Sequence, residues 1–168
     1  MADRAPSLRA QGVVNQLKRC GVTHVVWLPD TESKFMYDAI QAEPSLSLVP
    51  VCREGESMPI ATGLMLGGKT PVVLIQNTGF FESGDAIRGV CLDLKLPLLL
   101  MIGYRGYEGE GVPMQDSAGV FLEPMLKTWG IPYQIVEDDA HAPRIYQAFQ
   151  EAQARSGPVA ILIGREYE

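Results

Sequence analysis

The sequence contains few of the residues that build disulfide frameworks and metal sites. Its 168 residues include only three cysteines, Cys20, Cys52 and Cys91, which are far apart and form no CxxC motif, and only two histidines, His24 and His141. Scattered thiols of this kind do not make a disulfide scaffold, and so few Cys and His residues argue against a zinc-type site. We therefore expect free thiols in a reducing cytoplasm and no metal ligands in this chain.

Long apolar runs and basic blocks are also missing. The longest apolar run, Leu96 to Gly103, is far too short to cross a bilayer, and the first residues, MADRAPSLRAQG, lack the apolar centre of a secretory signal. The 14 Lys and Arg residues are outnumbered by 20 Asp and Glu residues, which gives a net charge of -6. These features disfavour nucleic-acid and membrane binding, and they predict a cytoplasmic protein.

What the sequence does contain is a regular alternation of two kinds of apolar segment. Hydrophobic residues make up 46% of the chain, enough for one domain, residues 1–168, with a real core. Helical spacing predicts helices over 7–20, 32–42, 57–67, 80–95, 118–129 and 140–155, and apolar β-branched runs predict strands over 22–28, 46–52, 71–76, 96–102, 133–136 and 159–163. The alternation predicts a doubly wound α/β fold with a mainly parallel six-stranded sheet and helices on both faces.

Four polar or glycine-containing loops follow the predicted strands. They are Pro29-Asp30-Thr31, Arg53-Glu54-Gly55, Gln76-Asn77-Thr78-Gly79 and Gly103-Tyr104-Arg105-Gly106. Ligands of open α/β sheets bind beyond the carboxyl ends of the strands. We therefore expect the ligand site among these four loops.

The common signatures of nucleotide-binding and hydrolytic sites are missing from these loops. GxGxxG is absent after the first strand, GxxxxGK[ST] is absent everywhere, and no Ser or Cys occupies a nucleophile elbow. The glycines of residues 105–111 (RGYEGEG) are loosely spaced, and they indicate a mobile loop or lid rather than a phosphate cradle. A plain nucleotide-binding Rossmann domain and a hydrolase are both disfavoured.

Glu54 lies where an apolar strand meets an apolar helix, and the residues alone allow two interpretations. Pro59 fits best in the first turn of a helix, so the regular helix begins near Ser57 and Glu54 falls in the turn before it. Glu54 is either a helix-start carboxylate paired with Arg53 or a carboxylate kept for chemistry, because a buried acid is costly when nothing pairs with it. Its neighbour Glu56 is interpreted as a solvated first-turn acid.

The segments REGESMPIATGLMLGGKTPVVLIQNTG and LKLPLLLMIGYRG resemble the pyrimidine-binding (PYR) domain of thiamine diphosphate enzymes. The resemblance is strongest to the phosphonopyruvate and sulfopyruvate decarboxylases and covers about Val22 to Gly106, more weakly Gly130 to Tyr133. It implies that Glu54 contacts N1′ of the cofactor's aminopyrimidine and shares a proton with it, which leads to removal of the proton at C2 of the thiazolium. It also implies the PYR type of the thiamine diphosphate-binding fold.

The resemblance assigns further residues to the site. It places Gln76, Asn77 and Thr78 beside cofactor and substrate, where their amide and hydroxyl groups can bind a small 2-oxo acid, although a self-satisfied turn is the alternative. Asp30 and Thr31 belong to another loop that faces substrate, and both also suit helix capping. Arg105 can bind a sulfonate or phosphonate through two N–H groups, with Gln115 and Asp116 as weaker candidates.

One expected part of such enzymes is missing from this chain. They hold the diphosphate through a divalent metal with a GDG motif and a downstream Asn, and the nearest match here, Ser83-Gly84-Asp85-Ala86, lacks the second Gly. The resemblance therefore implies half of an active site: the alpha subunit of a two-subunit decarboxylase acting on 3-sulfopyruvate, with paired alpha chains and a beta subunit that holds Mg²⁺ and the diphosphate of thiamine diphosphate. The alternatives are a phosphonopyruvate decarboxylase subunit and a non-catalytic PYR-like module that binds a partner.

Overall fold

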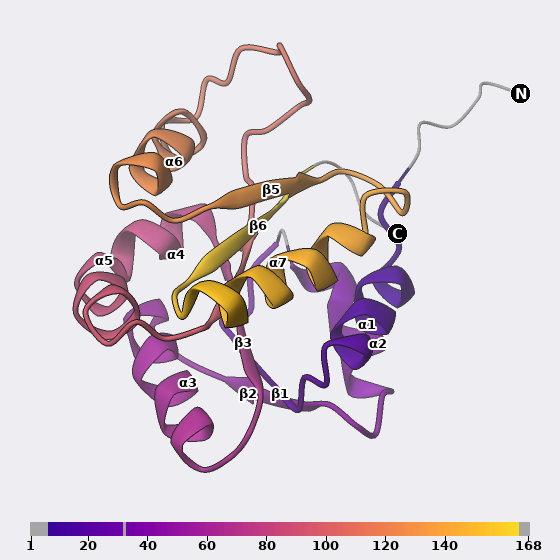
Figure 1. The fold of residues 1–168 in the computed structure, drawn as a ribbon. Helices are drawn as coiled ribbons and strands as arrows, with labels where there is room; N and C mark the ends of the chain where they lie inside the picture. Colours follow the sequence, from indigo (N-terminus) through magenta and orange to yellow (C-terminus); the bar gives the residue numbers. More distant parts are fainter. Residues whose placement is uncertain (1–6, 32, 165–168) are drawn as a thin grey trace, which may run out of the picture.

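The computed structural model describes residues 7–31 and 33–164, and its centre is a six-stranded sheet (Figure 1). All five strand pairings are parallel, and the strand order is β2-β1-β3-β4-β6-β5. The strands are β1 (His24–Trp27), β2 (Ser47–Pro50), β3 (Pro71–Gln76), β4 (Leu99–Gly103), β5 (Tyr133–Val136) and β6 (Val159–Ile163). The predicted parallel α/β sheet is confirmed.

Three of the four interior strands are buried along their whole length. Every residue of β3, β4 and β6 is buried, whereas the edge strands β2 and β5 are largely half-buried. A strand that is covered on both faces carries apolar side chains on both, which is why PVVLI, LLMI and VAILI are continuous apolar runs rather than alternating ones.

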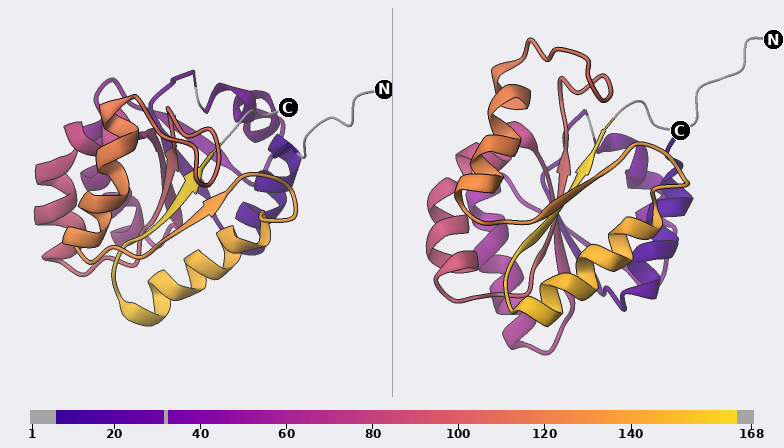
Figure 2. Two further views of the ribbon diagram at one scale, coloured as in Figure 1. Left: turned by 90° about the horizontal axis from the view of Figure 1, so that it is seen from above. Right: turned by 45° about the horizontal axis from the view of Figure 1, so that its top comes forward.

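Helices cover both faces of this sheet, as Figure 2 shows. One apolar core joins the sheet to α1 (Ala10–Arg19), α2 (Tyr37–Gln41) and α7 (Pro143–Arg155). The other core joins it to α3 (Ser57–Leu66), α4 (Asn77–Glu82), α6 (Ser117–Thr128) and the segment of α5 (Gly84–Ala86) and η3 (Ile87–Leu92). Two short 3₁₀ turns, η1 (Lys34–Met36) and η2 (Glu54–Glu56), precede α2 and α3.

The segment after β3 departs from the predicted loop and helix. A loop through Gly79 and one helix over 80–95 were expected, but α4 begins at Asn77 and ends at Glu82, and a π-helix follows over Ile87–Leu92. The buried Ser83 hydroxyl donates to the Gly79 carbonyl at 2.7 Å, which gives the backbone an alternative partner where the helix breaks. The predicted helix over 32–42 is likewise divided into η1 and α2, and residue 32 lies outside the described residues.

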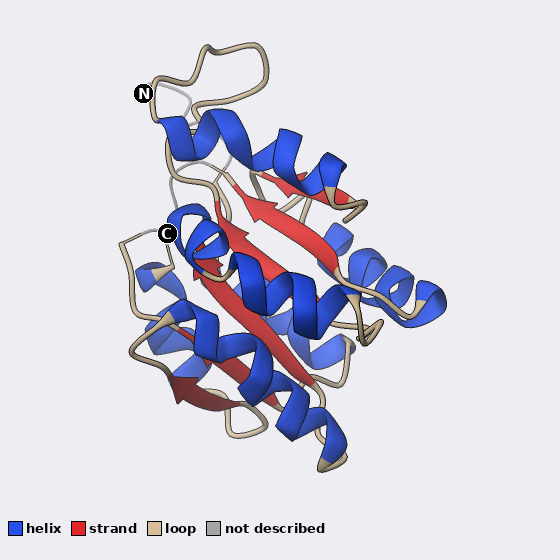
Figure 3. Ribbon diagram, turned by 90° about the vertical axis from the view of Figure 1, so that its left-hand side faces the viewer, coloured by secondary structure: helices blue, strands red, loops and turns tan. Residues whose placement is uncertain are grey.

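The strand order creates a crevice between β1 and β3. These strands are neighbours, but the chain leaves β1 toward α2 on one face and leaves β3 toward α4 on the other. The arrowheads point to one end of the sheet, which is the carboxyl end of the strands (Figure 3). A doubly wound sheet binds its ligand at that end, at the point where the strand order reverses. Near this point the turn after β2 packs against α4, which follows β3. No helix within the described ranges is long and apolar enough to cross a membrane.

Candidate active site

The turn that carries Glu54 links edge strand β2 to helix α3. Glu54 begins η2, and α3 follows from Ser57, with Pro59 in its first turn where no intrahelical N–H is required. Glu54 is half-buried and Glu56 is exposed, as the sequence predicts for a solvated first-turn acid. The predicted helix start near Ser57 is confirmed.

Arg53 pairs with Glu82, not with Glu54. Its Nε donates to Oε1 of Glu82, and the backbone N–H of Gly55 donates to Oε2 of Glu82 at 2.6 Å. Within residues 7–31 and 33–164 the carboxylate of Glu54 forms no hydrogen bond or ion pair. The expected pairing of Glu54 with Arg53 is therefore wrong, although Glu54 does begin a helical turn as the first interpretation had it.

The Glu54 side chain instead lies against the first turn of α4. A Cβ added to Gly79 would stand 2.8 Å from Oε1 of Glu54 and 2.9 Å from its Cδ, distances that real Cβ atoms do not show. Glycine at position 79 thus leaves the space that the Glu54 side chain occupies. The carboxylate therefore lies beside the residues that end β3, at the crevice side of the sheet.

Gln76, Asn77 and Thr78 are brought together at the end of β3, but their polar atoms are used differently. Asn77 is fully buried, its Nδ2 donates to the Arg105 carbonyl at 2.9 Å, and its Oδ1 accepts the Thr78 N–H at 3.0 Å. The exposed Thr78 donates its hydroxyl to Oε1 of Gln76 at 2.8 Å. Asn77 thus ties the loop after β4 to α4, while Gln76 and Thr78 form a hydrogen-bonded pair at the carboxyl end of β3.

Asp30 organises the loop after β1. Its carboxylate accepts the backbone N–H and the hydroxyl of Ser33 at 3.0 and 2.7 Å, and Ser33 in turn accepts the indole N–H of Trp27 at 2.7 Å. Asp30 and Thr31 also line a pocket of about 570 Å³ whose wall includes Trp27 and Tyr37. Asp30 thus stabilises the turn before η1, in agreement with the capping alternative, and it lines a pocket at the crevice as well.

Arg105 and Asp116 form an ion pair across the loop after β4. Nε of Arg105 lies 3.1 Å from Oδ2 of Asp116, and Oδ1 of Asp116 accepts the Ala118 N–H at 2.9 Å and so caps α6. The Arg105 side chain is 53% exposed. Its terminal NH₂ groups have no partner among the described residues, so they are open to an anion. Gln115 is exposed in the same loop.

Aromatic side chains that the sequence analysis did not single out anchor the root of this loop. Tyr104 is buried and donates its hydroxyl to Glu123 at 2.9 Å, and its ring stacks on Tyr107 with centroids 4.9 Å apart. Gly106, Gly109 and Gly111 have positive φ values, so the tip of the loop uses backbone that favours glycine. The loop is therefore anchored at its root and glycine-rich at its tip.

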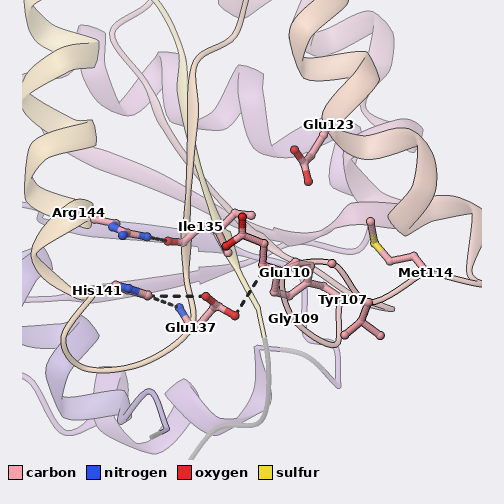
Figure 4. Close-up of a pocket in the computed structure, with 11 residues that line it drawn as sticks. Tyr107, Gly109, Glu110, Met114, Glu123, Ile135, Glu137, His141 and Arg144 are labelled. Carbon is pink, nitrogen blue, oxygen red and sulfur yellow. Dashed lines mark hydrogen bonds and ion pairs between the residues drawn. The ribbon is translucent and has the colours of Figure 1, made fainter.

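Beneath this loop lies a second pocket of about 510 Å³ (Figure 4). Tyr107 donates its hydroxyl to Glu137 at 3.3 Å, His141 lies against Glu137, and Arg144 donates to the Ile135 carbonyl at 2.6 Å. The bond from Tyr107 holds the loop to the residue after β5, and the bond from Arg144 joins α7 to β5. Among the residues described, no group of three or more His, Cys, Asp or Glu side chains is placed to hold a metal ion.

Comparison with known proteins identifies the family to which this site belongs. A family model described as the thiamine pyrophosphate enzyme, N-terminal TPP binding domain, matches residues 9–123. The match includes the Glu54 turn, the end of β3, and the loop of Arg105 and Asp116.

Curated relatives extend the similarity over almost the whole chain. The chain is 26% identical over 159 residues to the sulfopyruvate decarboxylase subunit alpha of Methanothermobacter thermautotrophicus, covering 94% of this chain and 96% of the relative. It is 29% identical over 156 residues to the protein of the same name in Methanocaldococcus jannaschii, covering 92% of each. A longer sulfopyruvate decarboxylase of Methanosarcina acetivorans is 26% identical over 152 residues, which cover 90% of this chain but 38% of that relative.

Proposed function

The chain belongs to the thiamine pyrophosphate enzymes through their N-terminal TPP binding domain, and from this we propose that it is the alpha subunit of a sulfopyruvate decarboxylase. The reaction takes up one proton and converts 3-sulfopyruvate into sulfoacetaldehyde and carbon dioxide. The observation that carries the proposal is the carboxylate of Glu54, which has no partner among the described residues and lies at the end of the sheet where the strands have their carboxyl ends.

The residues at this end of the sheet fit the aminopyrimidine ring of thiamine diphosphate. A half-buried carboxylate without a protein partner is available to a ligand group, and the missing side chain at Gly79 leaves room for it beside α4. When bound, thiamine diphosphate supplies the electron sink that allows a 2-oxo acid to lose carbon dioxide. Glu54 contributes by sharing a proton with ring nitrogen N1′ of the cofactor.

The remaining site residues bind and orient the substrate. We assign the terminal NH₂ groups of Arg105 to the sulfonate, since a guanidinium binds such oxygens through two parallel N–H groups. Gln76 and Thr78 face the keto acid with neutral amide and hydroxyl groups. Asp30 and Thr31 line the pocket after β1, and Asn77 holds the Arg105 segment in place through the Arg105 backbone carbonyl.

The proposal requires a second chain. A beta subunit would bind the diphosphate and Mg²⁺, two alpha chains would pair, and the assembly would act in the cytoplasm. The word alpha in the relatives' names supports a partner, and so does the longer Methanosarcina relative, of which the matched region is 38%.

Reconstitution tests the function. The chain is mixed with the product of a neighbouring gene that encodes GDG and a downstream Asn, together with thiamine diphosphate, Mg²⁺ and 3-sulfopyruvate, and the release of carbon dioxide is followed. We expect turnover only when both chains are present. Turnover of 3-phosphonopyruvate but not 3-sulfopyruvate would reassign the substrate, and a stable complex inactive on all 2-oxo acids would identify a non-catalytic module.

A further inference from the structure

Glu82 contacts both chain neighbours of Glu54. It is the last residue of α4, and its Oε2 accepts the Gly55 N–H at 2.6 Å while its Oε1 accepts Nε of Arg53. It forms no bond with Glu54 itself. The Glu82 carboxylate thus holds the backbone of Gly55, which follows Glu54, and the side chain of Arg53, which precedes it.

The turn that Glu82 holds has no caps of its own. Neither Arg53, which precedes η2, nor Glu56, which precedes α3, makes a side-chain capping hydrogen bond. The Gly55 N–H is one of the amide groups that a helix start leaves without an intrahelical partner. Glu82 supplies the acceptor from another helix, and a charged acceptor makes that hydrogen bond stronger than a neutral one would.

The position of Glu82 within α4 gives no reason for an acidic residue there. An acid at the last residue of a helix faces the negative end of the helix dipole, which is slightly unfavourable. The hydrogen bond from Arg53 is the main cause that lowers the pKa of Glu82 below its ordinary value, and the bond from Gly55 acts in the same direction. Glu82 is therefore explained by its contacts across to the Glu54 turn.

Helix α4 contacts this turn at its first residues as well. Gly79 faces the Glu54 carboxylate, and Ser83 bonds to the Gly79 carbonyl one turn later. Glu82 adds the second point of contact, on the backbone of the turn. A short rigid helix thus sets the spacing between the end of β3 and the carboxylate of Glu54.

We propose that Glu82 is a positioning residue that holds the Arg53–Gly55 turn so that Glu54 reaches the cofactor. The proposal rests on the proposed function, since the position of Glu54 matters to turnover only if Glu54 acts on thiamine diphosphate. Displacing a reacting group by about 1 Å can lower a rate about 100-fold, so a residue that never touches the cofactor can control the chemistry.

Amide exchange in the full chain tests the contact without any enzyme activity. Hydrogen–deuterium exchange at the Gly55 N–H is measured by NMR in the wild type, Glu82→Ala, Glu82→Gln and the control Glu56→Gln, which alters a nearby exposed acid. We expect exchange to be about tenfold faster in Glu82→Ala, because the opened amide loses protection, and unchanged in Glu56→Gln. Glu82→Gln keeps an acceptor oxygen, so it should lie between them.

The second measurement uses the assembled complex with its partner chain, cofactor and Mg²⁺. Exchange of the C2 proton of bound thiamine diphosphate is followed without substrate, and kcat and KM are then measured with 3-sulfopyruvate. In Glu82→Ala we expect C2 exchange and kcat to fall about 10- to 100-fold with little change in KM, because positioning and not substrate binding is lost. Glu82→Gln should recover part of both rates.

The outcomes separate this inference from the proposed function. The positioning role would be overturned if Glu82→Ala left the exchange of the Gly55 amide at its wild-type rate. It would also be overturned if Gly55 exchanged faster in Glu82→Ala but the C2 proton of the bound cofactor still exchanged at the wild-type rate. If the wild-type complex exchanges the C2 proton but does not decarboxylate 3-sulfopyruvate, and Glu82→Ala slows that exchange, the substrate assignment fails and the positioning role stands. A complex in which Glu54→Gln leaves C2 exchange unchanged would overturn the role of Glu54 and, with it, the positioning role of Glu82, while decarboxylation of 3-sulfopyruvate by the wild-type complex would still support the proposed function.

Discussion

Gly79 and Glu54 fit against each other without space to spare: a Cβ on Gly79 would stand 2.9 Å from Cδ of Glu54. The two residues come from different elements, the first turn of α4 and the η2 turn after β2. Because the contact is close, the effect of a larger side chain at position 79 should depend on which residue occupies position 54.

Gly79→Ala should therefore destabilise the chain only while Glu54 is present. We expect a loss of about 1–3 kcal/mol in the free energy of unfolding, because the new methyl group overpacks the contact. In a Glu54→Ala background the clash disappears, and the same change should stabilise α4 by about 0.5–1 kcal/mol, since Ala favours a helix over Gly. Urea unfolding of the four proteins measures this cycle, and equal losses in both backgrounds would disprove the contact.

Glu54→Gln should remove turnover but keep the cofactor. Glutamine matches the shape of Glu54 but cannot hold the proton at N1′, so in the assembled complex we expect kcat to fall about 100- to 10,000-fold. The affinity for thiamine diphosphate, measured by calorimetry, should change little. Glu56→Gln, in the same turn and exposed, serves as the control and should keep wild-type turnover. Full activity in Glu54→Gln would refute the assignment.

Arg105→Ala should weaken binding of the sulfonate specifically. The loss of a charge-assisted hydrogen-bonded pair of about 1.5–3 kcal/mol corresponds to a rise in KM of about 10- to 100-fold for 3-sulfopyruvate. Pyruvate, which has no sulfonate, should show no such rise. Arg88→Ala is the matched control, because Arg88 pairs with Asp85 and Asp93 on another exposed surface. A rise in KM that is equal for both substrates would exclude sulfonate recognition by Arg105.

Tyr107 should make the fold sensitive to alkali. Burial is the main cause that raises the pKa of Tyr107 from 10.0 to about 12, and the carboxylate of Glu137 adds to the rise. Between these values the folded chain keeps a proton that the unfolded chain loses, so the free energy of unfolding should fall as the pH rises through this window. Tyr107→Phe should reduce the fall, as measured by urea unfolding below and within the window. The buried thiols of Cys20 and Cys91 contribute in the same direction in both proteins and cancel in the comparison.

The sequence predicted the strands better than the turns between them. The expected bounds of β3, β5 and β6 agree with the structure. For β3 and β6 the reason is that a fully covered strand between turn residues leaves a clear apolar run. The start of α4 at Asn77 was not predicted, since Asn-Thr-Gly is typical of a turn. There the helix begins early because Asn77 bonds to Arg105 and Gly79 packs on Glu54, contacts that join distant parts of the chain.

The candidate site was predicted in part for the same reason. The rule that ligands bind beyond the carboxyl ends of strands selected the loops of Glu54 and Arg105, but it gave no partner for Arg53. The true partner, Glu82, is 29 residues further along the chain. Nothing in the sequence indicated this pairing, because Glu82 falls in the first turn of the predicted helix over 80–95, where an acid is favourable without a partner.

The hydrogen bond from Asn77 ends on the backbone carbonyl of Arg105 and not on its side chain. The anchor of the loop is therefore indifferent to which amino acid occupies position 105. A substitution at position 105 therefore replaces the proposed anion-binding side chain but leaves the acceptor of this bond, and with it the attachment of the loop to α4, in place.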